Sequence, residues 1–289
     1  MIAIDAMGGD FAPDAVLEGV VSCAKSSKIK ICLFGPRGDL EKKLAKLDSA
    51  WEKLQISIID APEIIEMGEE PVRAVKKKRN SSLVKAVELV ASGQCKAIVS
   101  AGNSGAVMIA SLLLIGRKKG VERPALIGFV PAIEKPVLCL DLGANADCKA
   151  EHLYQFAHMG VEYAKETLGA QNPSVGLLSN GEEPKKGSLV TKGAFSMLEK
   201  SGLNFIGNVE PCHVLQNKAD IVVSDGFSGN IMLKTLEAVA SLMLKNKCRL
   251  DDQGGALLLG VKKTVIIVHG SALPDNIERA IKHADFSGY

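Results

Sequence analysis

Aromatic side chains and long hydrophobic runs are scarce in this sequence. Phe, Trp and Tyr make up only 4% of the 289 residues, so platforms for stacking nucleic-acid bases are few. The formal net charge of +2 is too small to predict nucleic acid as a main partner. No apolar run approaches the roughly 20 residues that cross a bilayer. We therefore predict neither a nucleic-acid-binding nor a membrane-spanning protein.

The cysteines and histidines form no ligand cluster. The seven cysteines include no CxxC pair, and several lie in apolar runs where a thiol behaves as a small hydrophobic group. Neither an HExxH motif nor a Cys/His cluster occurs, so we predict no metal site. This cysteine pattern fits a reducing compartment, and no basic-plus-apolar leader follows Met1. Both observations predict a cytoplasmic protein.

Three familiar catalytic signatures are also missing. No GxGxxG spacing follows a predicted strand, and no GxxxxGK[ST] occurs, which disfavours a nicotinamide enzyme and a P-loop enzyme. The absence of a GxSxG elbow disfavours a serine hydrolase.

What the chain does contain is a repeated alternation of short apolar runs and longer helical patterns. The runs are rich in Val, Ile and Leu without strict alternation, as is typical of strands covered on both faces. This order predicts an α/β fold with a mainly parallel, Rossmann-like sheet in three α/β/α layers. Because no repeat or low-complexity linker occurs, we predict a single domain over residues 1–289. The expected strands are 2–6, 29–34, 56–60, 97–100, 125–131, 137–141, 175–179, 204–206, 221–224 and 265–269, and the expected helices are 14–25, 40–47, 81–92, 104–118, 150–168, 188–201, 230–245 and 275–283.

Five of the predicted strands run into glycine-bearing polar loops, namely residues 5–10, 100–105, 141–145, 224–230 and 269–271. In a parallel sheet the carboxyl ends of the strands share one edge, where such folds bind ligands. Glycine lets backbone amides approach an anion, and the helix that follows offers free N–H donors. A single loop of this kind is weak evidence, because Gly, Asn and Ser also make ordinary tight turns. Five together predict a phosphate-type site at a common rim.

Several cations and one histidine accompany these loops. Lys186 lies in the segment 180–188 beside a predicted helix start, where it could neutralise phosphate or simply be solvated. Lys192 and Lys234 lie one turn inside predicted helices, positions more often occupied by surface lysines. His269 ends a predicted buried strand, and its role in a site or in a turn stays open.

Eight segments carry a more specific signal, because they occur in order over almost the whole chain. They are MIAIDAMGGDFAPDA (1–15), MGEEPVRAVKKKRNSSL (67–83), IVSAGNSGAVM (98–108), ERPAL (122–126), LDLGANADCKAEHL (140–153), LNFIGN (203–208), DIVVSDGFSGNIMLKTLE (220–237) and HGS (269–271). Together they resemble the bacterial phosphate acyltransferase family, the acyl-acyl-carrier-protein:phosphate acyltransferases.

The resemblance implies an enzyme that transfers a fatty acyl group from acyl carrier protein to inorganic phosphate, forming acyl phosphate for glycerophospholipid synthesis. It implies a fold like those of isocitrate dehydrogenase and phosphotransacetylase. It also implies a homodimer, partly associated with the inner face of the cytoplasmic membrane. No cofactor is expected beyond the phosphopantetheine that the carrier brings. The basic runs Arg73–Arg79 and Arg117–Lys119 are either solvated helix ends or docking surfaces for that acidic carrier.

The mechanism that we expect relies on positioning and charge stabilisation. Asn230 would hold phosphate or the tetrahedral oxyanion, and Lys186 would offset its charge. Asp225 would orient donors, while His269 would either protonate the leaving sulfur or only shape the pocket. These four are the predicted catalytic residues. The predicted substrate-binding residues are Asp5, Gly8, Gly9, Asn103, Ser104, Gly105, Asn145, Lys192, Gly226 and Gly229.

Two departures from the family pattern stand out. Pro184 lies where family members have a different residue, which puts the shape of the loop around Lys186 in doubt. In the family a long amphipathic helical hairpin also follows the helix that we expect to end near residue 245. Here that hairpin is absent or omitted, since the chain passes almost directly from residue 245 to residue 251.

Three alternatives stay open. One is a phosphotransacetylase-like enzyme that acts on acyl-CoA, and another is a non-catalytic phosphate-binding protein that retains the fold. A decarboxylating dehydrogenase is a weaker third, because its metal-binding aspartates and dinucleotide site are not evident.

Overall fold

The computed structural model describes residues 1–243 and 254–286 and divides into two compact units. The first unit combines Met1–Lys118 with Asp251–Tyr289, and the second is Lys119–Leu250. The chain therefore leaves the first unit and later returns to it. The expectation of one domain over residues 1–289 stays a prediction.

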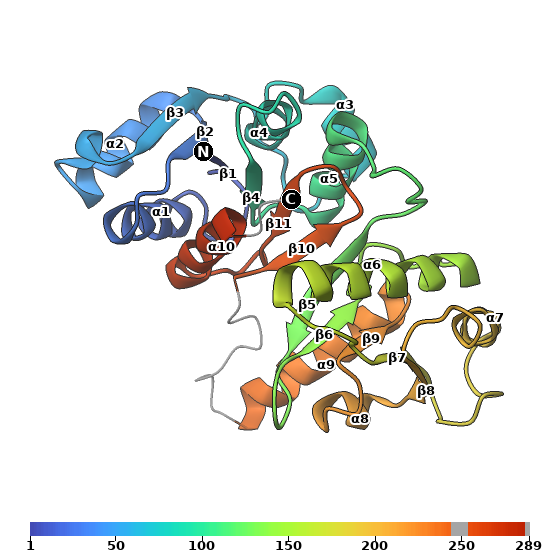
Figure 1. Ribbon diagram of the computed structural model, residues 1–289. Helices are drawn as coiled ribbons and strands as arrows, with labels where there is room; N and C mark the ends of the chain where they lie inside the picture. Colours follow the sequence, from blue (N-terminus) through green and yellow to red (C-terminus); the bar gives the residue numbers. More distant parts are fainter. Residues whose placement is uncertain (244–253, 287–289) are drawn as a thin grey trace. The chain divides into compact units, whose positions relative to one another are not determined.

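The first unit is built on a sheet with strand order β3-β2-β1-β4-β11-β10. Its strands are parallel except β10, which runs antiparallel to β11. Helices α1 and α10 pack together on one face and α4 lies on the other (Figure 1). The elements are β1 (Ile2–Asp5), α1 (Asp14–Ser26), β2 (Ile31–Gly35), α2 (Arg37–Leu47), the 3-10 turn Trp51–Lys53, β3 (Ile56–Asp60), α3 (Pro71–Lys77), α4 (Ser82–Ala91), β4 (Ala97–Ser100), α5 (Ser104–Ala110), the π-turn Ser111–Ile115, β10 (Ala256–Leu259), β11 (Thr264–Ile267) and α10 (Pro274–Phe286).

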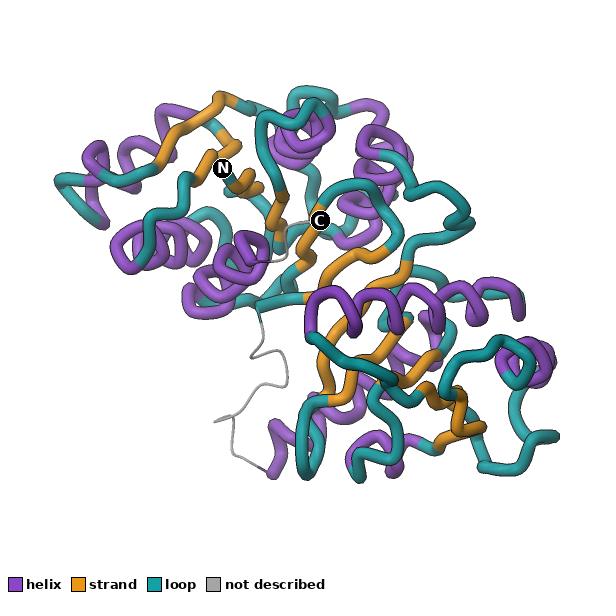
Figure 2. Tube along the Cα trace, viewed as in Figure 1, coloured by secondary structure: helices purple, strands orange, loops and turns teal. Residues whose placement is uncertain are grey.

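The second unit has the strand order β5-β6-β9-β7-β8, in which only β5 is antiparallel to its neighbour among the described strands. Helices α6 and α7 cover one face, and α9 covers the other (Figure 2). The elements are β5 (Ala125–Val130), β6 (Val137–Leu140), α6 (Ala150–Leu168), β7 (Val175–Leu178), α7 (Leu189–Leu198), β8 (Phe205–Val209), α8 (Pro211–Leu215), β9 (Ile221–Val223) and α9 (Gly226–Met243).

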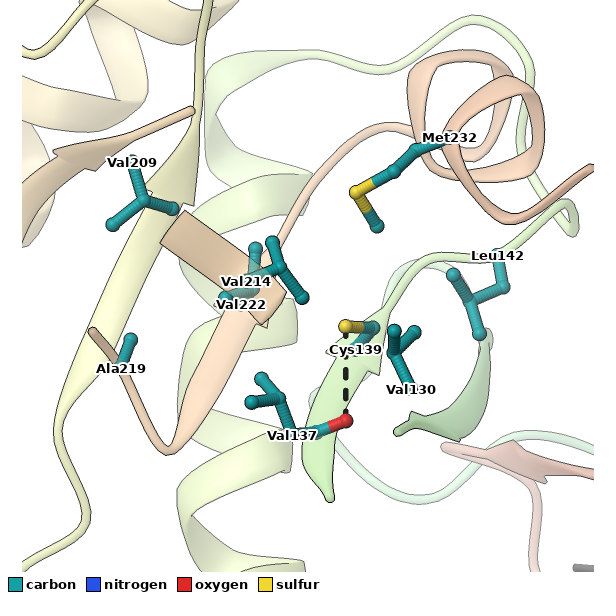
Figure 3. Close-up of a cluster of buried hydrophobic side chains, with 9 residues drawn as sticks. All are labelled: Val130, Val137, Cys139, Leu142, Val209, Val214, Ala219, Val222 and Met232. Atoms are coloured by element: carbon teal, nitrogen blue, oxygen red, sulfur yellow. Dashed lines mark hydrogen bonds between the residues drawn. The ribbon is translucent and has the colours of Figure 1, made fainter. Parts of the chain in front are cut away.

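The core of the second unit joins its sheet to α8 and α9. Met232 of α9 points toward Cys139 of β6, and Val214 of α8 packs into the same buried cluster (Figure 3). This cluster is aliphatic, as the low aromatic content predicts. It fixes the amino-terminal half of α9 against the strand ends.

The predicted α/β fold is confirmed, and an observed strand overlaps each expected range. Strand β10 and helices α3 and α8 were missed. Both helices are short and begin with proline, whose fixed φ suits the first helical position, and that signal was available in the sequence. Helix α9 starts at Gly226, not at residue 230 as expected, because the Asp225 side chain accepts the Ser228 N–H at 2.7 Å and caps it.

Candidate active site

Three of the predicted loops meet in the first unit. A Cβ added at Gly8, after β1, would lie 2.6 Å from the Gly102 nitrogen after β4. The Asp10 N–H donates to the Gly270 carbonyl, after β11, at 2.7 Å, and Gly9 has a φ of +112°. These loops pack backbone against backbone, so only glycine fits at Gly8. The predicted convergence of loops is thus observed within this unit.

Buried Asp5 stabilises this cluster of loops through hydrogen bonds. Its side chain is 3% exposed and accepts a hydrogen bond from the Ser100 hydroxyl at 2.7 Å, and that hydroxyl in turn accepts the Gly102 N–H. Burial raises the pKa of Asp5, while hydrogen bonds from Ser82, Ser100 and Met7 act in the opposite direction. Asp5 was predicted to bind substrate, and the structure places it as a buried support of the loops.

Asn103 is committed to structural contacts. Its Oδ1 accepts the Ala106 N–H and caps α5, and its Nδ2 donates to the Met67 and Glu69 carbonyls at 3.0 and 2.9 Å. The loop 66–70 therefore belongs to this cluster, which the sequence reasoning missed. Beside Asn103, Ser104 is exposed, and a Cβ added at Gly105 would lie 2.7 Å from Pro71.

His269 lies at the exposed end of the third loop of the first unit. Its Nδ1 accepts the Ser271 N–H at 3.2 Å and contacts the Ser271 hydroxyl at 2.8 Å. Because a backbone N–H can only donate, the neutral ring carries its proton on Nε2. His269 therefore offers an N–H donor to a ligand.

The other two predicted loops meet in the second unit. The Gly226 N–H donates to the Asn145 carbonyl at 2.8 Å. A Cβ added at Gly229 would lie only 2.0 Å from the Asp141 carbonyl oxygen. The Asn230 Nδ2 donates to the Leu142 carbonyl at 3.0 Å, which ties the first turn of α9 to the loop after β6. The prediction that all five loops of the chain share one rim stays a prediction.

Asp141 supports this second cluster and was not among the predicted site residues. Its carboxylate accepts four backbone N–H groups and the Asn145 Nδ2, and the residue is fully buried. Burial raises the pKa of Asp141, and the hydrogen bonds that it accepts lower it. A signal existed in the sequence, since Asp5 ends a buried strand, Asp141 directly follows one, and a glycine comes two or three residues after each.

The polar side chains of this cluster differ in how many hydrogen-bond donors and acceptors they leave free for a ligand. Asn145 is buried and donates to Asp141 and to the Pro124 carbonyl. Asp225 accepts from the N–H and the hydroxyl of Ser228, so it serves as the cap of α9. Asn230 uses one Nδ2 hydrogen for Leu142 and keeps a second.

The loop around Lys186 has a fixed shape. The Lys186 N–H donates to the Glu183 carbonyl at 2.9 Å, which closes a β-turn with Pro184 at its second position, where proline is favoured. The Gly187 N–H donates to Asn180 Oδ1 at 2.9 Å, and Asn208 Nδ2 donates to the Glu183 carbonyl at 2.8 Å. Pro184 therefore fits the loop.

Two predicted cations at the start of α7 form no ion pair with the described residues. Lys186 and Lys192 are exposed, and their ammonium groups form no ion pair with the residues that the structure describes. The neighbouring Glu182 carboxylate pairs with Lys218 and His213 and not with these two lysines. The neutral Ser188 side chain caps α7 by accepting the Thr191 N–H at 3.1 Å. This helix start can therefore receive an anion.

A cysteine nucleophile is not favoured near these loops. Burial raises the pKa of Cys148 to about 11 and that of Cys139 to about 12. Both thiols are therefore protonated near neutral pH and are poor nucleophiles.

Comparison with known proteins places the chain in a family. A family described as "Fatty acid synthesis protein" matches residues 1–246. A phosphate acyltransferase from Campylobacter fetus subsp. fetus is 44% identical, over 98% of this chain and 93% of the relative. One from Pelotomaculum thermopropionicum is 42% identical, over 98% and 90%. The chain belongs to the phosphate acyltransferase family. It is an enzyme of the acyltransferase class, as the resemblance of its motifs predicted.

Solved structures confirm the fold class. A phosphotransacetylase from Streptococcus pyogenes superposes with a TM-score of 0.70 at 21% identity, over 98% of this chain and 93% of that one. The EutD phosphotransacetylase from Staphylococcus aureus gives a TM-score of 0.68 at 18% identity, over 100% and 94%. At such identities the likeness concerns the fold alone.

The family members are longer than this chain within the matched region. The alignment with the Campylobacter relative spans 311 positions, whereas this chain has 289 residues, so the relative contains residues without a counterpart here. The expectation that the family hairpin is absent or omitted concerns residues 245–251, which lie outside the described residues. Within residues 1–243 and 254–286, no helix combines the length and apolar character needed to cross a membrane.

Proposed function

We propose that this enzyme transfers a fatty acyl group from acyl carrier protein to inorganic phosphate, and that the acyl phosphate serves glycerophospholipid synthesis. A phosphate oxygen attacks the thioester carbonyl carbon, the carbon–sulfur bond breaks, and the carrier thiolate takes up, through solvent, the proton that phosphate loses. Phosphate is already anionic and the thiolate leaves readily, so positioning and charge stabilisation dominate the catalysis. No cofactor beyond the phosphopantetheine of the carrier is needed.

The observation that carries this proposal is Lys186, whose ammonium group forms no ion pair with the described residues. It lies on a loop that hydrogen bonds fix at the start of α7. The amino end of α9 already holds the Asp225 carboxylate, which repels phosphate. The amino end of α7 has a neutral cap and two free cations nearby, Lys186 and Lys192. We therefore place phosphate at the start of α7.

One further side chain has a role in this proposal. Asn230 keeps one N–H that can stabilise a developing oxyanion. His269, in the first unit, has Nε2–H available as a donor, and its predicted catalytic role stays a prediction. Asp5, Asp225, Asn103 and Asn145 act as supports, since their side chains are used within the fold.

The exposed basic side chains of α3 and of the residues just after it suit the acidic carrier protein. Arg73, Lys76, Lys77 and Arg79 are exposed, whereas Lys78 is paired with Glu69. Such surface charge accelerates encounter with an oppositely charged partner, and its effect falls as salt rises. We also propose a homodimer that associates peripherally with the inner face of the membrane. The exposed Leu242 and Met243 of α9 support an apolar contact of this kind.

The test is an assay of palmitoyl-acyl carrier protein with labelled phosphate, scored as hydroxylamine-sensitive acyl phosphate. Lys186→Ala is expected to lower kcat/KM by about 10²–10³, the usual cost of removing a charge-stabilising donor. The adjacent, exposed Lys185→Ala is the matched control and should stay within about twofold of the parent enzyme.

Two outcomes would contradict the proposal. If palmitoyl-CoA is used and the acyl carrier is not, the enzyme is phosphotransacetylase-like. If calorimetry detects phosphate binding but neither donor yields acyl phosphate, the protein is a phosphate-binding protein. Equal losses in the two lysine variants would instead remove Lys186 from the site.

A further inference from the structure

The second unit contains a cavity of about 750 Å³ beside the Lys186 loop. Its walls come from the end of β7, the start of α7, the start of α8 and the first three turns of α9, which Figure 1 shows in yellow to orange. This volume lies within the roughly 300–1,000 Å³ typical of small-ligand pockets. One wall is the start of α7, where phosphate is placed above, and the rest of the cavity has no role in that placement.

The cavity has a polar end and an apolar body. Asn180, Gly187 and Ser188 form the polar end, directly next to Lys186 in the sequence. The apolar body is lined by Leu178, Pro211, Phe227, Ile231, Met232 and Leu236. On α9, Ile231 and Thr235 are one turn apart, as are Met232 and Leu236, so both pairs extend the body along the helix.

The chemistry of the walls selects the kind of occupant. No Lys, Arg or His is among the described residues that line the cavity, so it does not suit a phosphate or carboxylate. Among the described residues of the lining, Asp225 is the one with a charge, and it repels anions. Phe227 is the one aromatic residue in this described lining, so a planar base has no pair of rings to stack between. A neutral, flexible aliphatic group fits these walls.

One polar group among the described residues that line the cavity lacks a partner. The Ser179 hydroxyl oxygen is buried and forms no hydrogen bond with the residues that the structure describes. A buried hydroxyl without a partner is costly, and rotation about its Cα–Cβ bond can turn it toward a ligand carbonyl. The polar end can therefore receive the carbonyl of a ligand whose tail lies in the apolar body.

We propose that this cavity holds the fatty acyl chain of the donor, with the thioester at the Asn180–Ser188 end beside Lys186 and the tail along α9. The proposal rests on the proposed function and adds where the chain binds. Beyond the cavity, α9 continues with the exposed Val239 and Leu242, so longer chains can extend along the same helix. Chain-length preference is then set by the residues of α9 that line the cavity.

The experiment fills the cavity with a bulky side chain. Thr235 is exposed and lines the cavity, so Thr235→Trp is expected to occupy it without disturbing the buried core. The control is Ala238→Trp, on an exposed position of the same helix that is not part of the lining. Turnover is compared with palmitoyl- and butyryl-acyl carrier protein.

Each buried methylene group increases affinity roughly fourfold, so a long acyl chain loses more affinity than a short one when the cavity is filled. Thr235→Trp should lower kcat/KM for the palmitoyl donor by at least about tenfold and leave the butyryl donor within about twofold. Ala238→Trp should leave both within about twofold. Equal effects of Thr235→Trp on both donors, or no effect on either, would overturn the cavity as the acyl site.

A binding measurement separates this proposal from the proposed function. The neutral methyl ester of a fluorescent polyene fatty acid should bind the parent enzyme and Ala238→Trp but not Thr235→Trp. If no donor yields acyl phosphate and this binding pattern is still found, the proposed reaction fails and the acyl site stands. If the ester binds all three proteins equally, the acyl site fails whatever the enzyme catalyses.

Discussion

The loops after β1 and after β6 use the same device in the two units, with different partners. In the first unit Asp5 is held by the hydroxyls of Ser100 and Ser82 and by one backbone N–H, that of Met7, whereas in the second Asp141 accepts four backbone N–H groups and one side-chain amide. Hydroxyls can turn to other acceptors, but backbone N–H groups cannot. The conspicuous aspartates at strand ends are therefore supports, and the second loop depends on its aspartate more strongly.

The two loops also differ in what surrounds them. The first is packed against the loops after β4 and β11, and its glycines leave no room for a side chain. The second unit adds an uncommitted lysine and an apolar cavity. This difference supports our proposal that the phosphate and acyl sites belong to the second unit.

The largest expected effect concerns the two aspartates. Asp141→Ala removes the acceptor of four backbone N–H groups, one buried and three part-buried, at about 1–3 kcal/mol for each that stays unsatisfied, and should strongly destabilise the second unit. Asp5→Ala should cost clearly less, because its hydroxyl partners can find other acceptors. Hydrogen exchange resolved by peptide measures both, since unfolding of two units need not be two-state. Equal losses of protection in the two variants would remove the distinction.

The next comparison uses one residue type in the two units. Asn230→Ala should lower kcat by about 10²–10³ and keep the fold, because a donor to the oxyanion is lost. Asn103→Ala should mainly lower the melting temperature, since it removes the cap of α5 and two contacts to the loop 66–70. Turnover per folded molecule and calorimetric melting are measured together. The reverse pattern would move the chemistry to the first unit.

Close packing of the glycine loops gives an intermediate effect. Gly8→Ala places a Cβ 2.6 Å from the Gly102 nitrogen and should destabilise the first unit by about 1–3 kcal/mol. Gly38→Ala on α2 meets no atom within 4 Å and should be neutral or stabilise by about 0.5–1 kcal/mol. Urea unfolding followed by hydrogen exchange distinguishes the two. A tolerated Gly8→Ala would show that the loop can open.

The smallest effect is a pH dependence confined to the first unit. A hydrogen bond from Lys282, together with one from Ser22, lowers the pKa of Glu278 to about 2, so its ionised form favours the folded state. That contribution is present above the usual glutamate pKa and is lost as the pH falls from there toward 2. It should not exceed about 1 kcal/mol, as for other surface pairs.

Glu278→Gln tests this pH dependence. It should lower the stability of the α1–α10 pair at neutral pH and flatten its decline between about pH 4.5 and 2. Hydrogen exchange of α1 and α10 peptides, with peptides of the second unit as the internal control, checks it. An unchanged acid profile would show that the Glu278 contacts do not stabilise the pair.

Much of the fold was predictable because its signals are local. The apolar runs that become β1, β4 and β6 are short and rich in branched residues, and each is followed by Gly, Asn or Ser. Strand β10 was missed because its run of leucines lies between glycines and pairs antiparallel with β11, an arrangement that the parallel pattern does not predict. The loop 66–70 was missed as part of the first cluster because its contact with Asn103 joins distant segments.

By itself, the sequence determined the α/β class and the glycine-bearing loops, because hydrophobic periodicity and turn chemistry depend on a few neighbouring residues. It also determined the family, because eight motif segments occur in the family's order. Only the tertiary structure decided which polar side chains are committed and which are free. Four polar side chains form their hydrogen bonds within the fold, namely those of Asp5, Asn103, Asn145 and Asp225. The Lys186 ammonium group forms no ion pair with the described residues, so its charge is available to a ligand. Hydrogen-bond capacity is finite, and its use depends on neighbours that folding brings from far along the chain.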